Sequence, residues 1–148
     1  MKKNILLIAS TALVTFFSQF ASAAIPPQPA HCPDIAAIHA HGVGRGTIEL
    51  NHLWFAGTRS FNYNTPEGWT FIIGNIKSPT AYEAFLKATN ALSSLMFQAG
   101  PFYESEWERW TCVYATSEGY PAVAVTPILL TQGSLKDAVP TLDHYLKY

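Results

Sequence analysis

The spacing of apolar residues first predicts an antiparallel hairpin in the first half of the chain. In residues 53–63 apolar side chains recur at every second position with an interruption near Arg59, which places them on one face of a strand. Residues 69–76 are apolar on both faces, so we expect a central strand that pairs with 53–63. The run 47–50 has strand chemistry as well and precedes this hairpin.

A second hairpin is predicted in the last third of the chain. Residues 110–117 and 122–130 are rich in aromatic and β-branched residues, and the turn-forming stretch 118–121 separates them. Pro127 has no amide hydrogen, so strand pairing must end there or move to a sheet edge.

Helical periodicity appears between the two hairpins. A long helix is predicted from about Pro79 to Gln98, because Ser78 and Pro79 suit a helix start and Gly100-Pro101 ends the element. Its apolar face would consist of Ala81, Phe85, Ala88, Leu92, Leu95 and Met96. A short helix is predicted over residues 33–40, and the stretch 134–146 is weakly helical.

The order of these elements predicts one α+β domain over residues 32–148. Helix, hairpin, helix and hairpin favour an antiparallel sheet of about four strands with the long helix packed on one face, a two-layer sandwich. The proline-rich residues 24–31 precede the domain as an extended lead-in.

The first residues have the pattern of a signal peptide over 1–23. Two lysines precede an apolar stretch, and a small-x-small triplet ends at Ala23, so we expect cleavage between Ala23 and Ala24. The apolar stretch is shorter than a membrane-spanning helix needs, and no membrane span is expected after cleavage. The mature protein is therefore expected to be secreted or periplasmic.

Charge argues against nucleic acid as a partner. The full chain has nine basic and ten acidic side chains, cleavage removes two of the lysines, and the remaining basic residues are scattered. A nucleic-acid-binding surface needs a basic stripe, and the sequence offers none.

Cys32 and Cys112 are the only cysteines in the chain. An even pair in a small exported domain predicts a disulfide. A catalytic or metal-bound thiol is the alternative, but no CxxC or Cys/His spacing supports it.

No enzyme signature is present, and the chain is not expected to be an enzyme. It lacks GxSxG, HExxH and any motif that sets a nucleophile beside a base. The glycine-rich run 42–46 follows a helix and lacks the Lys-Ser/Thr pair of a phosphate loop.

The most suggestive polar pair is His39 and His41. In an extended segment their imidazoles would share a face and could bind a metal, whereas on a helix they diverge by about 200°. At a helix end they would instead favour the C-terminal dipole. Glu104, Glu106 and Glu108 likewise could line a strand as a cation site or form a solvated face.

Aromatic residues are abundant, with 4 Trp, 7 Tyr and 9 Phe. They can fill the core of a small domain. An exposed subset could instead form a platform for a ring-shaped ligand or a protein partner, with candidates Trp54, Tyr63, Trp107 and Tyr120.

Several segments resemble a small secreted family from Legionella, some of whose members are called hemin-binding protein (Hbp). The resemblance lies in the signal and proline-rich lead-in followed by Cys32-Pro33, and in residues 53–57, 69–74, 91–95, 100–102, 110–120 and 125–127. It implies a secreted protein of unknown function with hemin as a candidate ligand, and it supplies no ligand residues by position.

For hemin, the residues themselves suggest His39 or His41 as the iron ligand. Both precede a glycine-rich turn that would let a planar ligand approach the backbone. Arg45 is close enough in sequence to bind a propionate. Cys32-Pro33 resembles a haem-responsive pair, but a disulfide would consume its thiol. A secreted protein that binds another protein through an aromatic surface is the alternative function.

Overall fold

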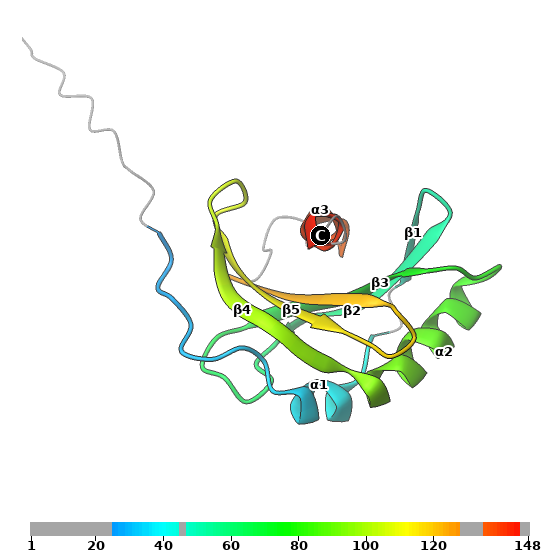
Figure 1. The fold of residues 1–148 in the computed structure, drawn as a ribbon, viewed down its shortest axis with the longest axis horizontal. Coiled ribbons are helices and arrows are strands. Elements are labelled where there is room, and N and C mark those ends of the chain that lie inside the picture. Colours follow the sequence, from blue (N-terminus) through cyan, green and yellow to red (C-terminus); the bar gives the residue numbers. More distant parts are fainter. Residues whose placement is uncertain (1–24, 45–46, 128–134, 146–148) are drawn as a thin grey trace, which may run out of the picture.

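A computed structural model describes residues 25–44, 47–127 and 135–145. Within them six strands form one open antiparallel sheet in the order β1-β2-β3-β6-β5-β4 (Figure 1). The α+β class and the antiparallel sheet are confirmed, while the expected four strands are too few. The strands are β1 Thr47–Leu50, β2 Leu53–Phe61, β3 Trp69–Ile76, β4 Met96–Glu104, β5 Arg109–Ala115 and β6 Pro121–Thr126.

Helices cover both faces of this sheet. One face, here called the inner face, is covered by α1 (Ile35–His41) and α2 (Ala81–Ala91). The other, the outer face, is covered by the 3-10 turn η2 (Leu135–Ala138) and by α3 (Val139–Tyr145) (Figure 1). The two-layer sandwich with a single covering helix is therefore wrong, because the weakly helical tail closes the second face.

β3 is one of the two central strands of the sheet, and the sequence predicted a central position for it. Every residue of Trp69–Ile76 is buried except Asn75, which is partly buried. β3 pairs with β2 on one side and with β6 on the other. The hairpin of β2 with β3 is confirmed, and so is the hairpin of β5 with β6, which ends at Thr126 just before Pro127.

The long helix is shorter than expected. α2 ends at Ala91, a 3-10 turn η1 (Leu92–Ser94) follows, and β4 already begins at Met96. The hydroxyls of Ser93 and Ser94 donate to the carbonyls three residues earlier, at 2.7 and 3.0 Å, and so compete with helix continuation. The chain then pairs with β5 as an edge strand.

Two apolar clusters form the core, one on each face. The inner cluster is rich in aromatic residues and includes Trp69, Phe71 and Tyr114. The outer cluster is mainly aliphatic and consists of Phe55, Ile72, Val123, Val125, Leu135, Ala138, Val139 and Leu142.

The lead-in lies against the sheet. The indole of Trp110 donates to the carbonyl of Pro26 at 2.9 Å, and Pro29 is buried. The predicted signal peptide over residues 1–23, its predicted cleavage site between Ala23 and Ala24, and Arg45 lie outside the described residues. None of the helices in the described part is long and apolar enough to cross a membrane.

Candidate functional site

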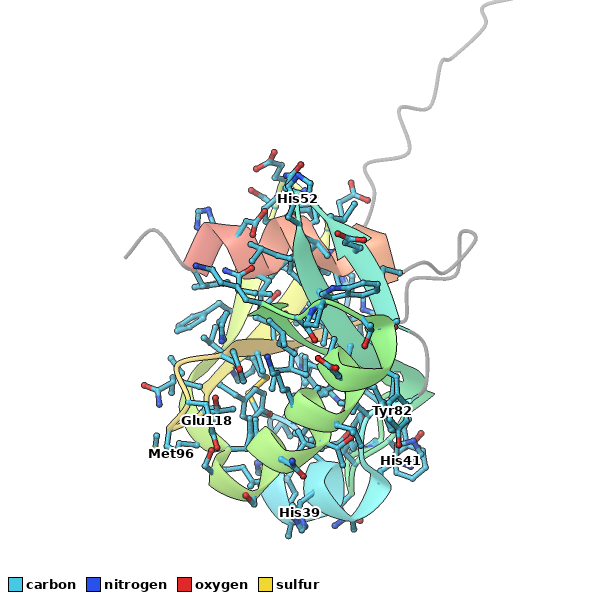
Figure 2. All side chains as sticks on the ribbon, turned by 90° about the vertical axis from the view of Figure 1, so that its right-hand side faces the viewer. His39, His41, His52, Tyr82, Met96 and Glu118 are labelled. Atoms are coloured by element: carbon cyan, nitrogen blue, oxygen red, sulfur yellow. A yellow bond between two sulfur atoms is a disulfide. The ribbon has the colours of Figure 1, made fainter. Side chains whose placement is uncertain are left out.

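His39 and His41 both lie in the last turn of α1. Asp34 caps the start of this helix, where its carboxylate accepts a hydrogen bond from a first-turn amide at 3.1 Å. Gly42 ends the helix with φ 75°, and its amide donates to the carbonyl of Ile38 at 2.9 Å. Because the segment is helical, the two imidazoles point in different directions (Figure 2), and they do not converge on one metal ion.

His41 has an apolar neighbour that His39 lacks. Its imidazole stacks on the ring of Phe61, with centroids 3.7 Å apart and an interplanar angle of 22°. The edge of Tyr63 lies next to the same imidazole, at 5.7 Å between centroids. A surface hollow of about 430 Å³ opens here, lined by Ala36, Ala37, Ala40, His41, Phe61 and Asn64.

The end of α1 is tied to β2, which holds His41 over Phe61. The hydroxyl of Thr58 accepts from the amide of Gly44 at 2.9 Å and donates to the carbonyl of Gly42 at 3.2 Å. At the other end of the helix the amide of Asp34 donates to the carbonyl of Tyr63 at 3.3 Å. One end of α1 is therefore tied to β2 and the other to Tyr63, two residues after β2, and these hydrogen bonds shape the hollow.

The buried tyrosines on the inner face do not offer phenolate ligands at neutral pH. Burial raises the pKa of Tyr63 to about 12, against the opposing effect of the Thr58 hydroxyl. Burial also raises the pKa of Tyr114, and the charge of Asp34 raises it further. The Tyr114 hydroxyl donates to the carbonyl of Pro33 at 2.8 Å. Imidazole is consequently the better candidate for an iron ligand on this face.

The disulfide between Cys32 and Cys112 is present, as predicted. It joins residues 80 positions apart and ties the segment before α1 to β5 on the inner face. The thiol of Cys32-Pro33 is thus consumed, so this pair has no free thiolate for haem iron.

A nearly buried ion pair lies at one end of the outer face and was not predicted. Nε of Arg109 donates to Oε2 of Glu104 at 3.4 Å, and their side chains are only 3% and 9% exposed. The hydroxyl of Thr141 on α3 donates to the same oxygen at 3.4 Å. The guanidinium of Arg109 lies 4.8 Å from the ring centroid of Trp107. Burial raises the pKa of Tyr145, and the nearby Glu104 carboxylate raises it further.

The predicted acidic run does not line one strand face. Glu104 ends β4 inside the ion pair, whereas Glu106 and Glu108 are exposed in the turn that follows. Across the described ranges, no group of three or more His, Cys, Asp or Glu side chains could hold a metal ion.

The predicted aromatic platform is not formed by the residues named for it. Tyr63 is fully buried, and Trp54 is half-buried with its indole donating to the carbonyl of Ser78 at 2.9 Å. Trp107 and Tyr120 are half-buried too. The large apolar side chains that are exposed in the described part are Ile25, Phe61, Tyr82, Leu86, Met96, Phe97 and Phe102.

The chain belongs to the family described as Domain of unknown function (DUF4949), whose model matches residues 31–127. The matched span contains α1, α2 and all six strands, and it ends before η2 and α3. No curated protein and no solved structure matches the chain. Because the family carries no assigned activity, function must be argued from the surface of this chain.

Proposed function

We propose that the mature chain is a small secreted or periplasmic binding protein whose ligand is hemin. The observation that carries the proposal is the exposed imidazole of His41 beside an apolar hollow. Haem iron takes imidazole as an axial ligand, and a planar porphyrin gains binding energy from apolar walls. The resemblance to the hemin-binding family is the reason for naming this ligand among other planar, apolar molecules.

His41 is the better candidate for the iron ligand than His39. The stack on Phe61 restricts the plane of the His41 imidazole, so less freedom is lost when a ligand binds. Three alanines of α1 line the hollow beside it and leave room for a large ring system. His39 is exposed, is not among the residues that line the hollow, and points elsewhere (Figure 2). Arg45, four residues after His41, is proposed to bind a propionate as a bidentate donor.

We also propose that the mature chain is exported from the cytoplasm. The signal pattern in residues 1–23 supports export, and the Cys32–Cys112 disulfide is the kind of bond that persists outside the cytoplasm. Mass measurement of the protein purified from culture medium and from periplasm tests it. The expected N-terminus is Ala24, and recovery of uncleaved chain in the cytoplasm alone would contradict export.

Hemin titration of purified residues 24–148, followed by absorption spectroscopy, tests the ligand. The expected result is saturable binding with a shifted Soret band. His41→Ala should weaken binding by about tenfold or more and alter the iron spectrum, because the axial bond is lost. His39→Ala is the matched control from the same helical turn and should leave both unchanged.

Two further variants separate coordination from adsorption. Phe61→Ala removes the stacked ring and should weaken binding while keeping the spectrum of a histidine-ligated iron. The double variant with His39→Ala and His41→Ala should behave like His41→Ala alone. Unchanged affinity and spectrum in the double variant would mean that hemin only adsorbs on the surface, and the proposed site would be wrong.

Protein binding is a second candidate function, favoured by the edge strand β4. Met96, Phe97 and Phe102 on this strand are 49%, 47% and 44% exposed. Exposed apolar residues on an edge strand are typical of a surface that another chain covers. If the mature protein shows no Soret shift, sedimentation of wild type against Phe97→Asp tests this candidate. Association that is lost in the variant supports it, and a monomer in both cases contradicts self-association through β4.

A further inference from the structure

α1 and α2 cover the inner face of the sheet with unequal apolar contacts (Figure 1). α2 has eleven residues, and its Ala84, Ala88 and Ala91 are fully buried. α1 has seven residues, of which only Ile38 is buried. A helix this short is not stable on its own in water, so it stays helical only while tertiary contacts hold it. The position of α1 therefore depends on contacts made outside the helix.

The contacts that hold α1 lie mainly at its two ends. Before the helix, Cys32 is bonded to Cys112 of β5. One residue later, the carbonyl of Pro33 accepts a hydrogen bond from the hydroxyl of Tyr114 at 2.8 Å. After the helix, the hydroxyl of Thr58 bonds to the backbone of the following residues at 2.9 and 3.2 Å. Breaking the disulfide would leave α1 with one buried side chain of its own and a few hydrogen bonds.

The two cysteines of the disulfide differ in their access to solvent. Cys112 is fully buried in the inner cluster. Cys32 is only partly buried, and it lines a second surface hollow of about 430 Å³ whose wall includes Phe97 and Pro101 of β4. Thiol–disulfide exchange begins when a thiolate attacks one sulfur, and its rate depends on access to that sulfur. The hollow therefore opens the Cys32 side of the bond to a thiolate, whereas the Cys112 side is closed.

We infer that the Cys32–Cys112 bond is a redox switch for α1, opened by a dithiol reductant that attacks Sγ of Cys32. The first thiolate of the dithiol forms a mixed disulfide with Cys32 and displaces the thiolate of Cys112. The second thiolate then attacks the dithiol's own sulfur in the mixed disulfide, which releases Cys32 and leaves the dithiol as a cyclic disulfide. Two electrons and two protons pass to the cysteines, so each opening consumes one dithiol.

Reduction releases α1 while the sheet and α2 stay in place. α2 is held by its own buried alanines, and β3 is paired on both sides without help from the disulfide. His41 moves with α1, so its stack on Phe61 opens as well. Oxidising surroundings keep the bond closed, and a protein dithiol of the CxxC type is a reductant of the required class. The inference stands independently of hemin binding, because it concerns only the bond and the helix.

Amide hydrogen exchange of the mature protein, with and without dithiothreitol, tests the release of α1. The amides of Ile38 and Gly42 each donate within or at the end of this helix at 2.9 Å. In the reduced protein they should exchange at least about tenfold faster than in the oxidised protein, and at least about tenfold faster than the amides of β3. Oxidised dithiothreitol should restore slow exchange. Unchanged exchange in α1 after complete reduction, or equal rates in α1 and β3, would overturn the inference.

The double variant Cys32→Ala with Cys112→Ala is the matched control. It should show the fast α1 exchange of the reduced protein without any reductant, and dithiothreitol should not change it further. Near-UV circular dichroism of the variant and of the reduced protein should keep the signal of the aromatic inner core, which includes Trp69 and Phe71. A chain that loses this signal on reduction would refute the inference, because the bond would then hold the whole domain and not α1 alone.

The point of attack is tested separately with glutathione, a monothiol that forms a stable mass adduct. The oxidised mature protein is treated briefly with excess glutathione, quenched with acid and mapped by peptide mass measurement. The adduct should be found on Cys32 at least about tenfold more often than on Cys112, because only the Cys32 side of the bond faces the hollow. An adduct mainly on Cys112, or no adduct at all, would overturn the assignment of Cys32 as the attacked residue.

Discussion

The inner and outer faces of the sheet are covered by different means. The inner face carries large aromatic side chains beneath α1 and α2, and the Cys32–Cys112 bond fastens its cover to β5. The outer face carries aliphatic side chains around Gly57 and Gly74, beneath a single short helix near the end of the chain. On the inner face the segment before α1 is held covalently, whereas η2 and α3 on the outer face are held by apolar packing and by the hydrogen bond from Thr141 to Glu104.

The two faces are therefore stabilised in different ways, one by a disulfide and the other by the packing of a helix. A disulfide acts largely by restricting the unfolded chain, whereas a packed helix acts only while it is docked. The inner cover should therefore resist local opening, and the outer cover should open at a lower free energy than the rest of the domain.

Removing the disulfide is expected to have the largest effect. The double variant Cys32→Ala with Cys112→Ala should lose about 4 kcal/mol of the free energy of unfolding, because the bond closes a long loop. Urea denaturation of wild type and variant measures the difference. A loss below about 1 kcal/mol would show that noncovalent contacts alone hold the inner cover.

On the outer face, Leu142→Ala should lower the free energy of unfolding by about 3 kcal/mol. Leu142 is fully buried, and truncation leaves a cavity above Gly74. Hydrogen exchange should show faster opening of α3 while β3 stays protected. Equal acceleration in α3 and in the central strand would mean that the outer cover does not open on its own.

Tyr63 makes the inner face sensitive to alkaline pH. Its folded pKa is about 12, above the ordinary 10.0, so its contribution is complete below pH 10 and is lost as the pH rises towards 12. The loss from this residue should amount to about 2 to 3 kcal/mol. Denaturation of wild type and Tyr63→Phe at pH 9, 10.5 and 12 should show a shallower decline in the variant. Parallel declines would contradict the role of Tyr63.

The smallest expected effect tests the fit between Gly74 and α3. Gly74→Ala should destabilise the protein by about 2 kcal/mol, because the new methyl group would meet Phe55 and Leu142. Combining it with Leu142→Ala should give less than the sum of the two losses, since the shortened side chain leaves space. Strict additivity in denaturation would show that the two positions do not share one space.

Much of the fold could be predicted from the sequence because the relevant signals are local. The apolar run of β3 indicated a central strand, and Pro127 marked the end of pairing just after Thr126. The cysteine pair and the compartment rules gave the correct bond. The helix end was misjudged because apolar spacing continued through Leu95 and Met96, while the serines of η1 were not recognised as hydrogen-bonding to the backbone.

The candidate site was predictable only in part. The sequence singled out His39 and His41 but gave no means to choose between them, because Phe61 lies twenty residues after His41 and reaches it through the fold. The ion pair of Glu104 and Arg109 was missed for a related reason. The sequence shows Glu104 only as one member of an acidic run, whereas its partners Arg109 and Thr141 lie on other elements.

Local patterns were enough to predict the class of element at most positions, the bonded cysteines and export, since these predictions depend on neighbouring residues and on composition. The pairing of β4 as an edge strand and the packing of the weakly helical tail on the outer face depend on long-range contacts instead. Gly57 and Gly74 have no apolar side chain to mark them in a pattern, yet a Cβ atom at Gly57 would collide with the backbone oxygen of Phe71 and with Leu135, and one at Gly74 would collide with Phe55 and Leu142. Such complementarity joins residues far apart in the chain, and no local spacing records it.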